Sequence, residues 1–287
     1  MAEESQGDRF VHLTDLHFWE IVRNPFALMN KRALGAMNVL LRRRKEFLID
    51  RAGAYAAAVA GTGIQDVVIT GDLTSTATER EFEMGVAFVQ DLERRGLRVS
   101  VIPGNHDVYT FESVRTKRFE RHFGPWMPGE SLPTLQTLPG GTPILYVPTV
   151  CANLLSSRGR ITDAEYRCVA ELLEGASSPV VVAGHYPLLD RTYGYDAGAG
   201  RRLRGAAALY DVLGASGVTI LYLCGHVHRF SLVRCARHAT ITHLTTGAFF
   251  RHDRRSSVEG EFAAIRCDGT GFQVRRHLFE GEWRASE

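Results

Sequence analysis

Five short segments of this chain carry side chains that could bind divalent metal ions, and each follows a run of apolar residues. Carboxylate, imidazole and amide groups together form a mixed oxygen and nitrogen ligand set, which suits divalent first-row metals. The segments are Asp15-Leu16-His17, Gly71-Asp72, Gly104-Asn105-His106-Asp107, Gly184-His185 and Gly225-His226-Val227-His228. Each alone could be a polar turn or a helix cap. Because the same arrangement recurs five times, we predict one shared metal centre.

The first two segments contribute the carboxylates. Asp15 and His17 are separated by one residue, so both side chains can turn toward one point beyond a strand end. Asp72 has two carboxylate oxygens and could bridge two cations, and Gly71 before it lets the backbone turn sharply. Taken alone, Asp72 would be interpreted as the cap of a following helix.

The third segment combines a ligand with a proton donor. Asn105 offers an amide oxygen as a neutral ligand, His106 beside it could donate a proton, and Asp107 could orient the imidazole of His106. The last two segments add histidines. His185 alone would be weak evidence, whereas two histidines separated by one residue after a glycine are typical of a metal-binding pair.

The apolar runs before these segments are short, rich in Val and Ile, and predict buried strands. They cover residues 10–14, 67–70, 99–102, 180–183 and 218–224. Helical patterns lie between them at 47–60, 78–95 and 203–213, and Thr162 with Glu165 forms a capping box that opens a further helix. Alternating strands and helices predict an α/β layered fold, in which polar ligands collect at the carboxyl ends of strands.

The tail of the chain has a different pattern. Residues 240–250, 261–267 and 272–279 alternate between apolar and polar side chains, as antiparallel strands do, and residues 268–271 supply a turn. We expect these strands to form a second sheet that packs on the first. No linker divides the chain into two domains.

Composition sets broad bounds on the function. The chain has 287 residues and a formal net charge of +2, which gives no reason to expect nucleic-acid binding. Its five cysteines show no C-x-x-C spacing, which favours a reducing compartment. We find no secretory signal and no apolar stretch long enough to span a bilayer. We therefore expect a cytoplasmic protein, with attachment to the surface of the inner membrane as the alternative.

In this order, the five motifs resemble those of the calcineurin-like metallophosphoesterase superfamily, whose pattern is D-x-H, G-D, G-N-H-D, G-H and G-H-x-H. The resemblance covers about residues 9 to 250. It implies a four-layer αββα sandwich, in which two mixed β-sheets pack face to face and are flanked by helices. We expect one such domain over residues 9–287, with a basic amphipathic helical insertion at about 18–47.

The resemblance also implies a role for each motif residue. The first metal would be held by Asp15, His17, Asp72 and His228. The second metal would be held by Asp72, Asn105, His185 and His226. His106 would stabilise the transition state or protonate the leaving oxygen, and Asp107 would hold His106 in place. The two divalent metals would be Mn, Fe, Zn, Co or Ni, because mixed ligands do not select sharply among them.

The activity implied is hydrolysis of phosphoester bonds by a metal-bridging hydroxide, with a phosphodiester as the favoured substrate. The sequence His-Leu-Thr-Asp-Leu-His at residues 12–17 is similar to that of bacterial cyclic-nucleotide phosphodiesterases. Enzymes that cleave UDP-2,3-diacylglucosamine share a similar start, so a diphosphatase acting at a membrane surface is the alternative. A non-catalytic binding module on the same scaffold would be expected to lack some of these ligands.

The segment from residue 18 to 47 is the most distinctive part of the sequence. It holds seven basic residues against two acidic ones, and between residues 28 and 41 its apolar residues fall on one helical face. Such a helix could lie on an anionic membrane and serve a nucleotide-linked lipid substrate. A lid helix packed on the domain, with its basic residues solvated or guiding a phosphate, is the favoured interpretation of the two.

Overall fold

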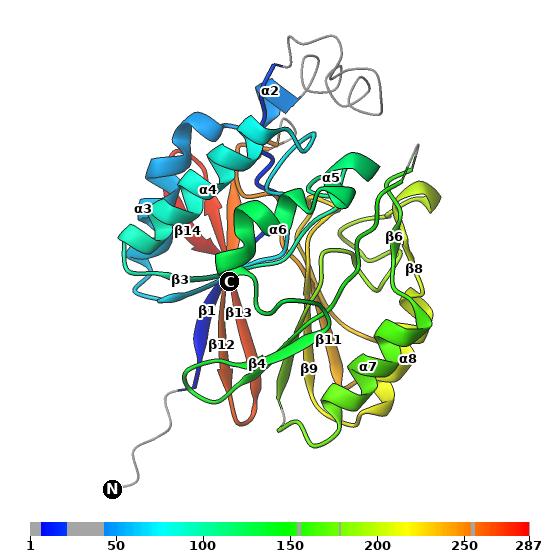
Figure 1. The fold of residues 1–287 in the computed structure, drawn as a ribbon. Helices are drawn as coiled ribbons and strands as arrows, with labels where there is room; N and C mark the ends of the chain where they lie inside the picture. Colours follow the sequence, from blue (N-terminus) through cyan, green and yellow to red (C-terminus); the bar gives the residue numbers. More distant parts are fainter. Residues whose placement is uncertain (1–6, 22–42, 154–155, 178, 254–255, 287) are drawn as a thin grey trace, which may run out of the picture.

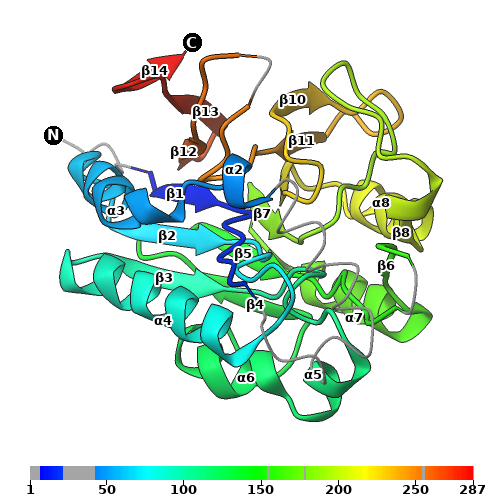
Figure 2. The ribbon, with the colours of Figure 1, turned by 90° about the horizontal axis from the view of Figure 1, so that it is seen from above.

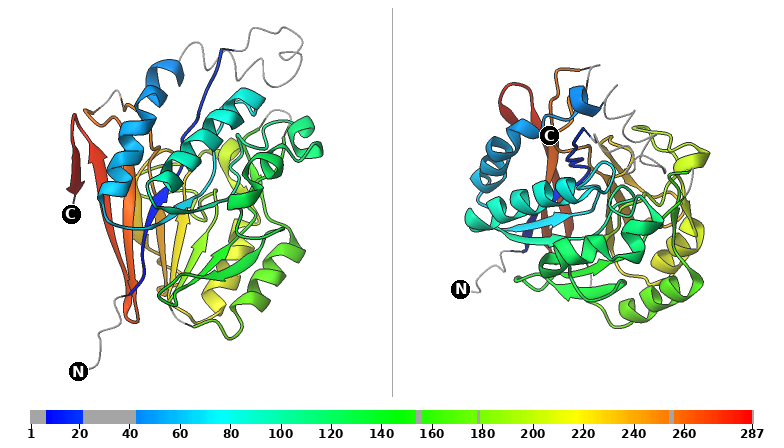
Figure 3. Two further views of the ribbon diagram at one scale, coloured as in Figure 1. Left: turned by 60° about the vertical axis from the view of Figure 1, so that its left-hand side comes forward. Right: turned by 45° about the horizontal axis from the view of Figure 1, so that its top comes forward.

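The structure, a computed structural model, describes residues 7–21, 43–153, 156–177, 179–253 and 256–286. Two six-stranded sheets pack face to face, and helices cover their outer surfaces (Figure 1). The left view of Figure 3 shows the strands of the two sheets as neighbouring layers. This arrangement confirms the predicted α/β fold, a four-layer αββα sandwich.

The first sheet has the strand order β14-β13-β12-β1-β2-β3. Its strands are β1 (Arg9–Leu13), β2 (Asp66–Ile69), β3 (Arg98–Val101), β12 (Glu261–Asp268), β13 (Gly271–Phe279) and β14 (Trp283–Ser286). Strands β1, β2 and β3 are parallel, whereas β12 pairs antiparallel with β1. The carboxyl ends of β1, β2 and β3 therefore lie at one edge of this sheet.

The second sheet has the order β10-β11-β9-β7-β5-β4. Its strands are β4 (Thr134–Thr137), β5 (Pro143–Tyr146), β7 (Val180–Ala183), β9 (Ile220–Cys224), β10 (Ser231–Arg234) and β11 (Ile241–Thr245). Strands β5, β7, β9 and β11 are parallel. A separate parallel pair is formed by β6 (Gly159–Arg160) and β8 (Leu203–Arg204).

Helices α3 (Ala52–Gly61) and α4 (Glu79–Arg94) cover the first sheet, and α7 (Asp163–Leu173) and α8 (Ala206–Ala215) cover the second (Figure 2). Shorter helices are α2 (Arg44–Glu46), α5 (Phe111–Arg115) and α6 (Arg118–Phe123). The predicted capping box opens α7, where Thr162 and Glu165 each accept a hydrogen bond from the other's backbone. Thr78 and Glu81 form the same motif at the start of α4.

The core between the two sheets is closed by apolar side chains from both. Phe10, Val68 and Ile265 of the first sheet pack with residues such as Tyr146 and Leu223 of the second, and all are at most 1% exposed. Burying each such side chain contributes about 1.5–3 kcal/mol. Because these strands are packed on both sides, their ends cannot shift independently, and the loops that leave them start from fixed points.

The tail strands do not form a sheet of their own, contrary to our expectation. Strands β12, β13 and β14 extend the first sheet beside β1, whereas β11 joins the second sheet and runs parallel to β9. Periodicity shows that a strand has one buried face, but it does not show which neighbour the strand pairs with. The predicted turn is confirmed, because β12 and β13 form a hairpin around Gly269 and Thr270.

Three further expectations concern the insertion, the cysteines and membrane-spanning segments. Residues 22–42, which contain most of the predicted amphipathic helix, lie outside the described residues. All five cysteines are free thiols. Among the described residues, none of the helices has the length and apolar character needed to cross a bilayer.

Candidate metal centre

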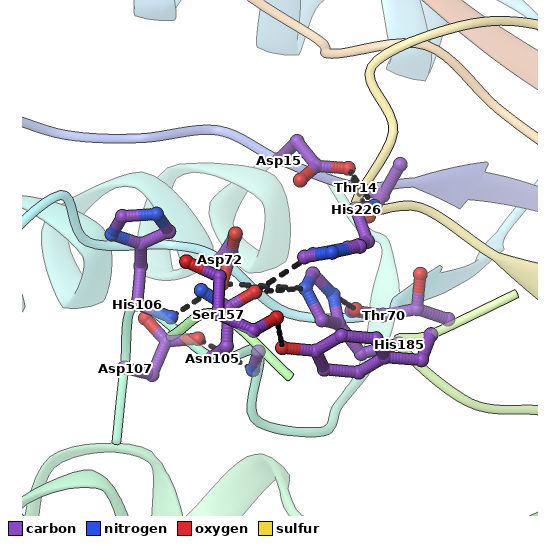
Figure 4. Close-up of polar contacts among 12 residues, drawn as sticks. Thr14, Asp15, Thr70, Asp72, Asn105, His106, Asp107, Ser157, His185 and His226 are labelled. Atoms are coloured by element: carbon purple, nitrogen blue, oxygen red, sulfur yellow. Dashed lines mark hydrogen bonds and ion pairs between the residues drawn. The ribbon is translucent and has the colours of Figure 1, made fainter. Parts of the chain in front are cut away.

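The five predicted segments meet at one edge of the sandwich. They follow β1, β2 and β3 in the first sheet and β7 and β9 in the second, so side chains from both sheets face a common space (Figure 4). Two groups of side chains there could each hold a metal ion. The first consists of Asp15, His17, Asp72 and His228, and the second includes Asp72, His185 and His226.

In the first group the side-chain atoms that could bind a metal lie within 4.8 Å of one another. The Nε2 atom of His17 is 3.6 Å from Oδ2 of Asp72 and 3.7 Å from Oδ1 of Asp15. The Nε2 atom of His228 is 2.9 Å from the same nitrogen of His17 and 3.1 Å from Oδ1 of Asp15. Four potential ligand atoms therefore surround one point.

The second group lies on the other side of Asp72. Its Oδ1 is 3.5 Å from Nε2 of His185, whereas its Oδ2 faces His17 in the first group. The amide oxygen of Asn105 is 3.1 Å from Nε2 of His185 and 2.8 Å from Nδ1 of His226. One carboxylate thus presents an oxygen to each group, which is the geometry that a bridging ligand requires.

Main-chain carbonyls fix which ring nitrogen of His17 and of His185 faces the centre. The carbonyl of Thr74 lies 3.2 Å from Nδ1 of His17, and that of Thr70 lies 2.8 Å from Nδ1 of His185. Since a carbonyl only accepts hydrogen bonds, these nitrogens carry the protons. In the neutral rings, the lone pairs of both Nε2 atoms therefore point inward, as metal binding demands.

A main-chain carbonyl also orients His226, but it binds Nε2 of this ring, so that Nδ1 faces the centre. The carbonyl of Arg201 lies 3.0 Å from Nε2 of His226, so the lone pair of the neutral ring is on Nδ1, which faces Asn105. Oxygen and nitrogen lone pairs that converge in this way repel one another unless a cation lies between them. Oδ1 of Asp15 is buried and has no hydrogen-bond partner among the described residues. The residues therefore fit a pair of divalent cations.

The pKa values of the candidate histidine ligands show where a metal ion must displace a proton. Burial lowers the pKa of His185, but the carboxylates of Asp72 and Asp15 outweigh burial and raise this pKa to about 9. Burial, followed by the nearby positive charges, holds the pKa of His17 and of His226 well below the ordinary value. Metal binding thus competes with a proton mainly at His185.

The candidate ligands share an uncommon backbone conformation. Seven non-glycine residues in the described part of the chain have positive φ, and five of them belong to the two groups. Their φ angles are 54° for Asp15, 53° for His17, 53° for Asp72, 68° for His226 and 52° for His228. This left-handed conformation is unfavourable for most L-residues and clusters at functional sites.

Glycines allow the backbone to approach these ligands closely. A Cβ atom at Gly225 would collide with the hydroxyl of Thr14 and with Oδ2 of Asp15. A Cβ atom at Gly71, which has φ of 93°, would collide with the backbone of Gly104. Both glycines are needed because the loops of different strands touch at these points.

His106 lies beside the first group, and its imidazole is held by a residue that we did not predict. Its Nδ1 donates a hydrogen bond of 2.6 Å to the carbonyl of Ser75, and its backbone N–H donates to Oδ1 of Asp72. The backbone contact places the ring next to the bridging carboxylate. The centroids of the His106 and His17 rings are 4.9 Å apart, and the two rings are nearly perpendicular.

Asp107 does not orient His106 in the way that the sequence suggested. In the described part of the chain its carboxylate accepts hydrogen bonds from the backbone N–H groups of Leu73, Thr74 and Gly104 and from the hydroxyl of Thr74. Burial, and then the charge of Asp72, raise the pKa of Asp107 to about 7. Asp107 ties the loop after β2 to the loop after β3, and Ser75 takes the role predicted for Asp107.

Sequence reasoning also missed Arg43, which is 9% exposed and lies between His17 and His106. We counted it only as one of seven basic residues in the insertion. The supporting carbonyls of Thr70, Thr74, Ser75 and Arg201 carry no signal in residue type, because every residue has a carbonyl. Pattern and spacing therefore found the side chains that converge but not the atoms that hold them.

Comparison with known proteins agrees with this geometry. Residues 8–230 match the family model of the calcineurin-like phosphoesterases. A search of curated protein sequences found no match. Among solved structures, a dimetal phosphatase from Danio rerio is similar, with 12% identity, a TM-score of 0.64 and coverage of 98% of both chains.

Two other solved structures share the fold over part of their length. A purple acid phosphatase from yellow lupin (Lupinus luteus) seeds is 11% identical with a TM-score of 0.63, and the match covers 99% of this chain and 54% of that one. A 5'-nucleotidase from Candida albicans is 13% identical with a TM-score of 0.53, and the match covers 94% and 51%. At these identities the structures support the fold, whereas the family model covers most of the sequence, including all five motifs. This chain belongs to the calcineurin-like phosphoesterase family.

Proposed function

We propose that this protein is a dimetal-dependent phosphodiesterase that cleaves its substrate by direct attack of hydroxide on phosphorus. The observation that carries the proposal is the position of Asp72, whose two carboxylate oxygens face two separate groups of ligand atoms. We assign the first metal to Asp15, His17, Asp72 and His228. We assign the second metal to Asp72, Asn105, His185 and His226.

Two divalent cations bound there would lower the pKa of water and neutralise charge on the phosphoryl oxygens. The protein's own residues supply the rest. His106 is held through Nδ1 by the carbonyl of Ser75, and its Nε2 lies 2.9 Å from Nη2 of Arg43. In the neutral ring Nε2 is an acceptor, so His106 would have to take up a second proton before it could protonate the leaving oxygen. Asp107 keeps the loops after β2 and β3 together, so that Asp72 and His106 remain in register.

A diester carries a second substituent, and the structure offers space for one. A cavity of about 470 Å³ is lined by Pro103 and Val108, the residues on either side of the third motif. Its wall also holds Phe111, which is 57% exposed, and the cations Arg160 and Arg204. A lining that combines apolar side chains with two arginines and one acidic residue, Glu120, suits a leaving group that has both an apolar part and a polar part.

Hydrolysis by the metal-loaded protein tests this proposal directly. The panel contains bis-p-nitrophenyl phosphate, p-nitrophenyl phosphate, 3′,5′-cyclic AMP and UDP-2,3-diacylglucosamine, each assayed with Mn²⁺, Zn²⁺ or Co²⁺. We expect the diesters to be cleaved and Asp72→Ala to lose at least ~10³-fold in kcat/KM. Asp91→Ala, which removes a carboxylate from the surface of α4, should keep wild-type activity. Equal activity of Asp72→Ala and Asp91→Ala would contradict the dimetal proposal, and preference for the monoester would contradict the substrate class.

A further inference from the structure

Arg43 places a buried positive charge at the edge of the candidate metal centre. Its Nη1 donates to the carbonyl of Ser75 at 3.2 Å, and its Nη2 lies 2.9 Å from Nε2 of His106. The same Nη1 is 3.3 Å from Nδ1 of His17, a candidate ligand of the first metal. The guanidinium therefore borders the space between the first metal group and His106.

The position of Arg43 is fixed by packing. The carbonyl of Arg43 accepts a hydrogen bond from the N–H of Phe47, whose side chain is 2% exposed. The Phe47 ring packs edge-on against His17, with centroids 4.8 Å apart, and against His228 at 5.8 Å. The next residue, Leu48, donates a backbone hydrogen bond to Phe250. The turn that carries Arg43 is thus attached to the ligands themselves.

The charge of Arg43 has no directly bonded anion within the described residues. Its hydrogen bonds there go to a carbonyl and to the ring of His106, while Asp72, Glu81 and Asp15 act on it only through space. Arginine stays protonated in proteins, and burying a cation without a bonded anion is unfavourable. The two proposed metals would add further positive charge at this place. Such an arrangement is explained if an anion binds there during function.

We propose that Arg43 binds a non-bridging oxygen of the substrate's phosphoryl group, as a third cationic contact beside the two metals. This inference rests on the proposed function. A guanidinium can donate two parallel hydrogen bonds to phosphate oxygens, which suits a group that must both hold and orient the phosphoryl. Because Arg43 also borders His106, the bound phosphoryl group would lie between the metals and His106.

Orthophosphate binding tests Arg43 without depending on turnover. We would compare wild type with Arg43→Met, Arg43→Lys and Arg44→Met, where Arg44 is the exposed neighbour in the same helical turn. For each protein, metal content, the dissociation constant of orthophosphate by calorimetry, and kcat/KM for bis-p-nitrophenyl phosphate are measured. We expect Arg43→Met to keep two metals per chain, to bind orthophosphate at least ~10-fold more weakly and to lose ~10²–10³-fold in kcat/KM.

The other variants separate a substrate contact from a structural role. Arg43→Lys should recover only part of the phosphate affinity, because a lysine ammonium does not reproduce the planar fork. Arg44→Met should stay within about twofold of wild type. If Arg43→Met matches Arg44→Met in affinity and turnover, the inference fails and the proposed function stands. Loss of metal in both Arg43→Met and Arg43→Lys also overturns it, because Arg43 would then act as a support of His17.

A different result would separate the two proposals. If the metal-loaded wild type cleaves no phosphoester of the panel but binds orthophosphate, and Arg43→Met weakens that binding, then Arg43 is an anion-binding residue and the hydrolytic function is wrong. If orthophosphate binds wild type and Arg43→Met equally and the panel is not cleaved, both proposals are wrong.

Discussion

At the candidate metal centre, individual atoms of neighbouring loops are in contact, so small changes of side-chain volume should have large effects. Asp15 shows this most clearly. Its Oδ2 accepts hydrogen bonds from the hydroxyl of Thr14 and the N–H of His226, both at 2.9 Å, which leaves Oδ1 directed toward the first metal group. The carboxylate therefore connects the loop after β1 to the loop after β9.

Gly225→Ala tests how closely these two loops must approach. The added methyl group would collide with the Asp15 carboxylate, so we expect loss of at least one metal per chain and a decrease of about 1–3 kcal/mol in the free energy of unfolding. Metal content by elemental analysis and urea unfolding check the two effects. The control is Gly53→Ala in α3, where a Cβ atom meets nothing within 4 Å. Unchanged metal content in Gly225→Ala would show that the loops can separate without harm.

A buried histidine away from the metal centre should make stability depend on pH. Burial lowers the pKa of His243 from 6.5 to about 3, and its Nε2 accepts a hydrogen bond from the N–H of Leu188. Between these two values the unfolded chain binds one proton more than the folded chain. The contribution of neutral His243 to the free energy of unfolding is therefore fully present above about pH 6.5. It falls as the pH decreases, by about 1.4 kcal/mol per pH unit.

His243→Gln removes this titration while keeping an acceptor for Leu188. Between pH 6.5 and 5 we expect the free energy of unfolding of wild type to fall by about 1.5–2 kcal/mol more than that of the variant. Urea unfolding at a series of pH values, with metal held saturating, measures the difference. Parallel curves for the two proteins would mean that His243 is protonated in the folded state.

At the scale of elements, two capping boxes of the same type begin helices in different surroundings. In α7, the side chain of Glu165 bonds to Thr162, its own capping partner, and to no other residue of the described part of the chain. In α4, Glu81 also accepts hydrogen bonds from the backbone N–H groups of Ser75 and Thr76. Because the carbonyl of Ser75 holds His106, the start of α4 is connected to His106.

This difference predicts separable effects of two matched substitutions. Glu165→Ala should cost about 1 kcal/mol of stability and leave kcat/KM unchanged. Glu81→Ala should cost more, about 2–4 kcal/mol, because buried N–H groups lose their acceptor. It should also lower kcat/KM by at least ~10-fold, since Ser75 is released. Thermal unfolding and diester hydrolysis distinguish these outcomes, and equal activities of the two variants would show that the loop at Ser75 and Thr76 holds its shape without Glu81.

The sequence predicted the elements that carry buried, regular patterns. Strands β1, β2, β3, β7 and β9 are apolar runs that stop at a motif, and the amphipathic pattern of α4 is equally clear. Strand β4, with the sequence TLQT, is half exposed and polar, and β14 is a four-residue edge strand. Such short, exposed strands lack the alternation that sequence reasoning depends on. Their existence is determined by the neighbours they pair with.

The same distinction holds for the site. Motif order predicted which side chains converge, because parallel strands bring their carboxyl ends to one edge. It did not predict that Asp107 connects two loops, since a carboxylate after a histidine could bond either the ring or the backbone. Arg43 could not be recognised in a segment rich in arginine. Only its contacts distinguish it from Arg44 beside it.

At the scale of the whole molecule, metal binding should couple the two sheets. The first sheet supplies Asp15, Asp72 and Asn105 through its loops, and the second supplies His185 and His226. Metals held by ligands from both sheets bind the folded state only, so they stabilise it by mass action. Apolar packing thus holds the core of the sandwich, and bound metals would hold one of its edges.

Removing the metals tests this coupling. At a free metal concentration of 100 times the dissociation constant, one site contributes about 2.7 kcal/mol, which corresponds to roughly 5–10 °C in Tm for a chain of this size. We expect a chelator to lower the Tm of wild type by at least this amount, and added Mn²⁺ or Zn²⁺ to restore it. Asp72→Ala should not respond. If the chelator leaves the Tm of wild type unchanged, metal binding does not stabilise the packing of the two sheets.

The positive φ angles of the five candidate ligand residues set stability without metal against activity. Without metal, glycine would have the lower backbone conformational energy at each of these positions, because an aspartate or histidine there is held in an unfavourable conformation. Selection for heat resistance in a chelating medium should therefore accumulate glycines at these positions and produce a robust protein that has lost its chemistry. Selection in the presence of metal should retain all five, because bound cations offset the local strain.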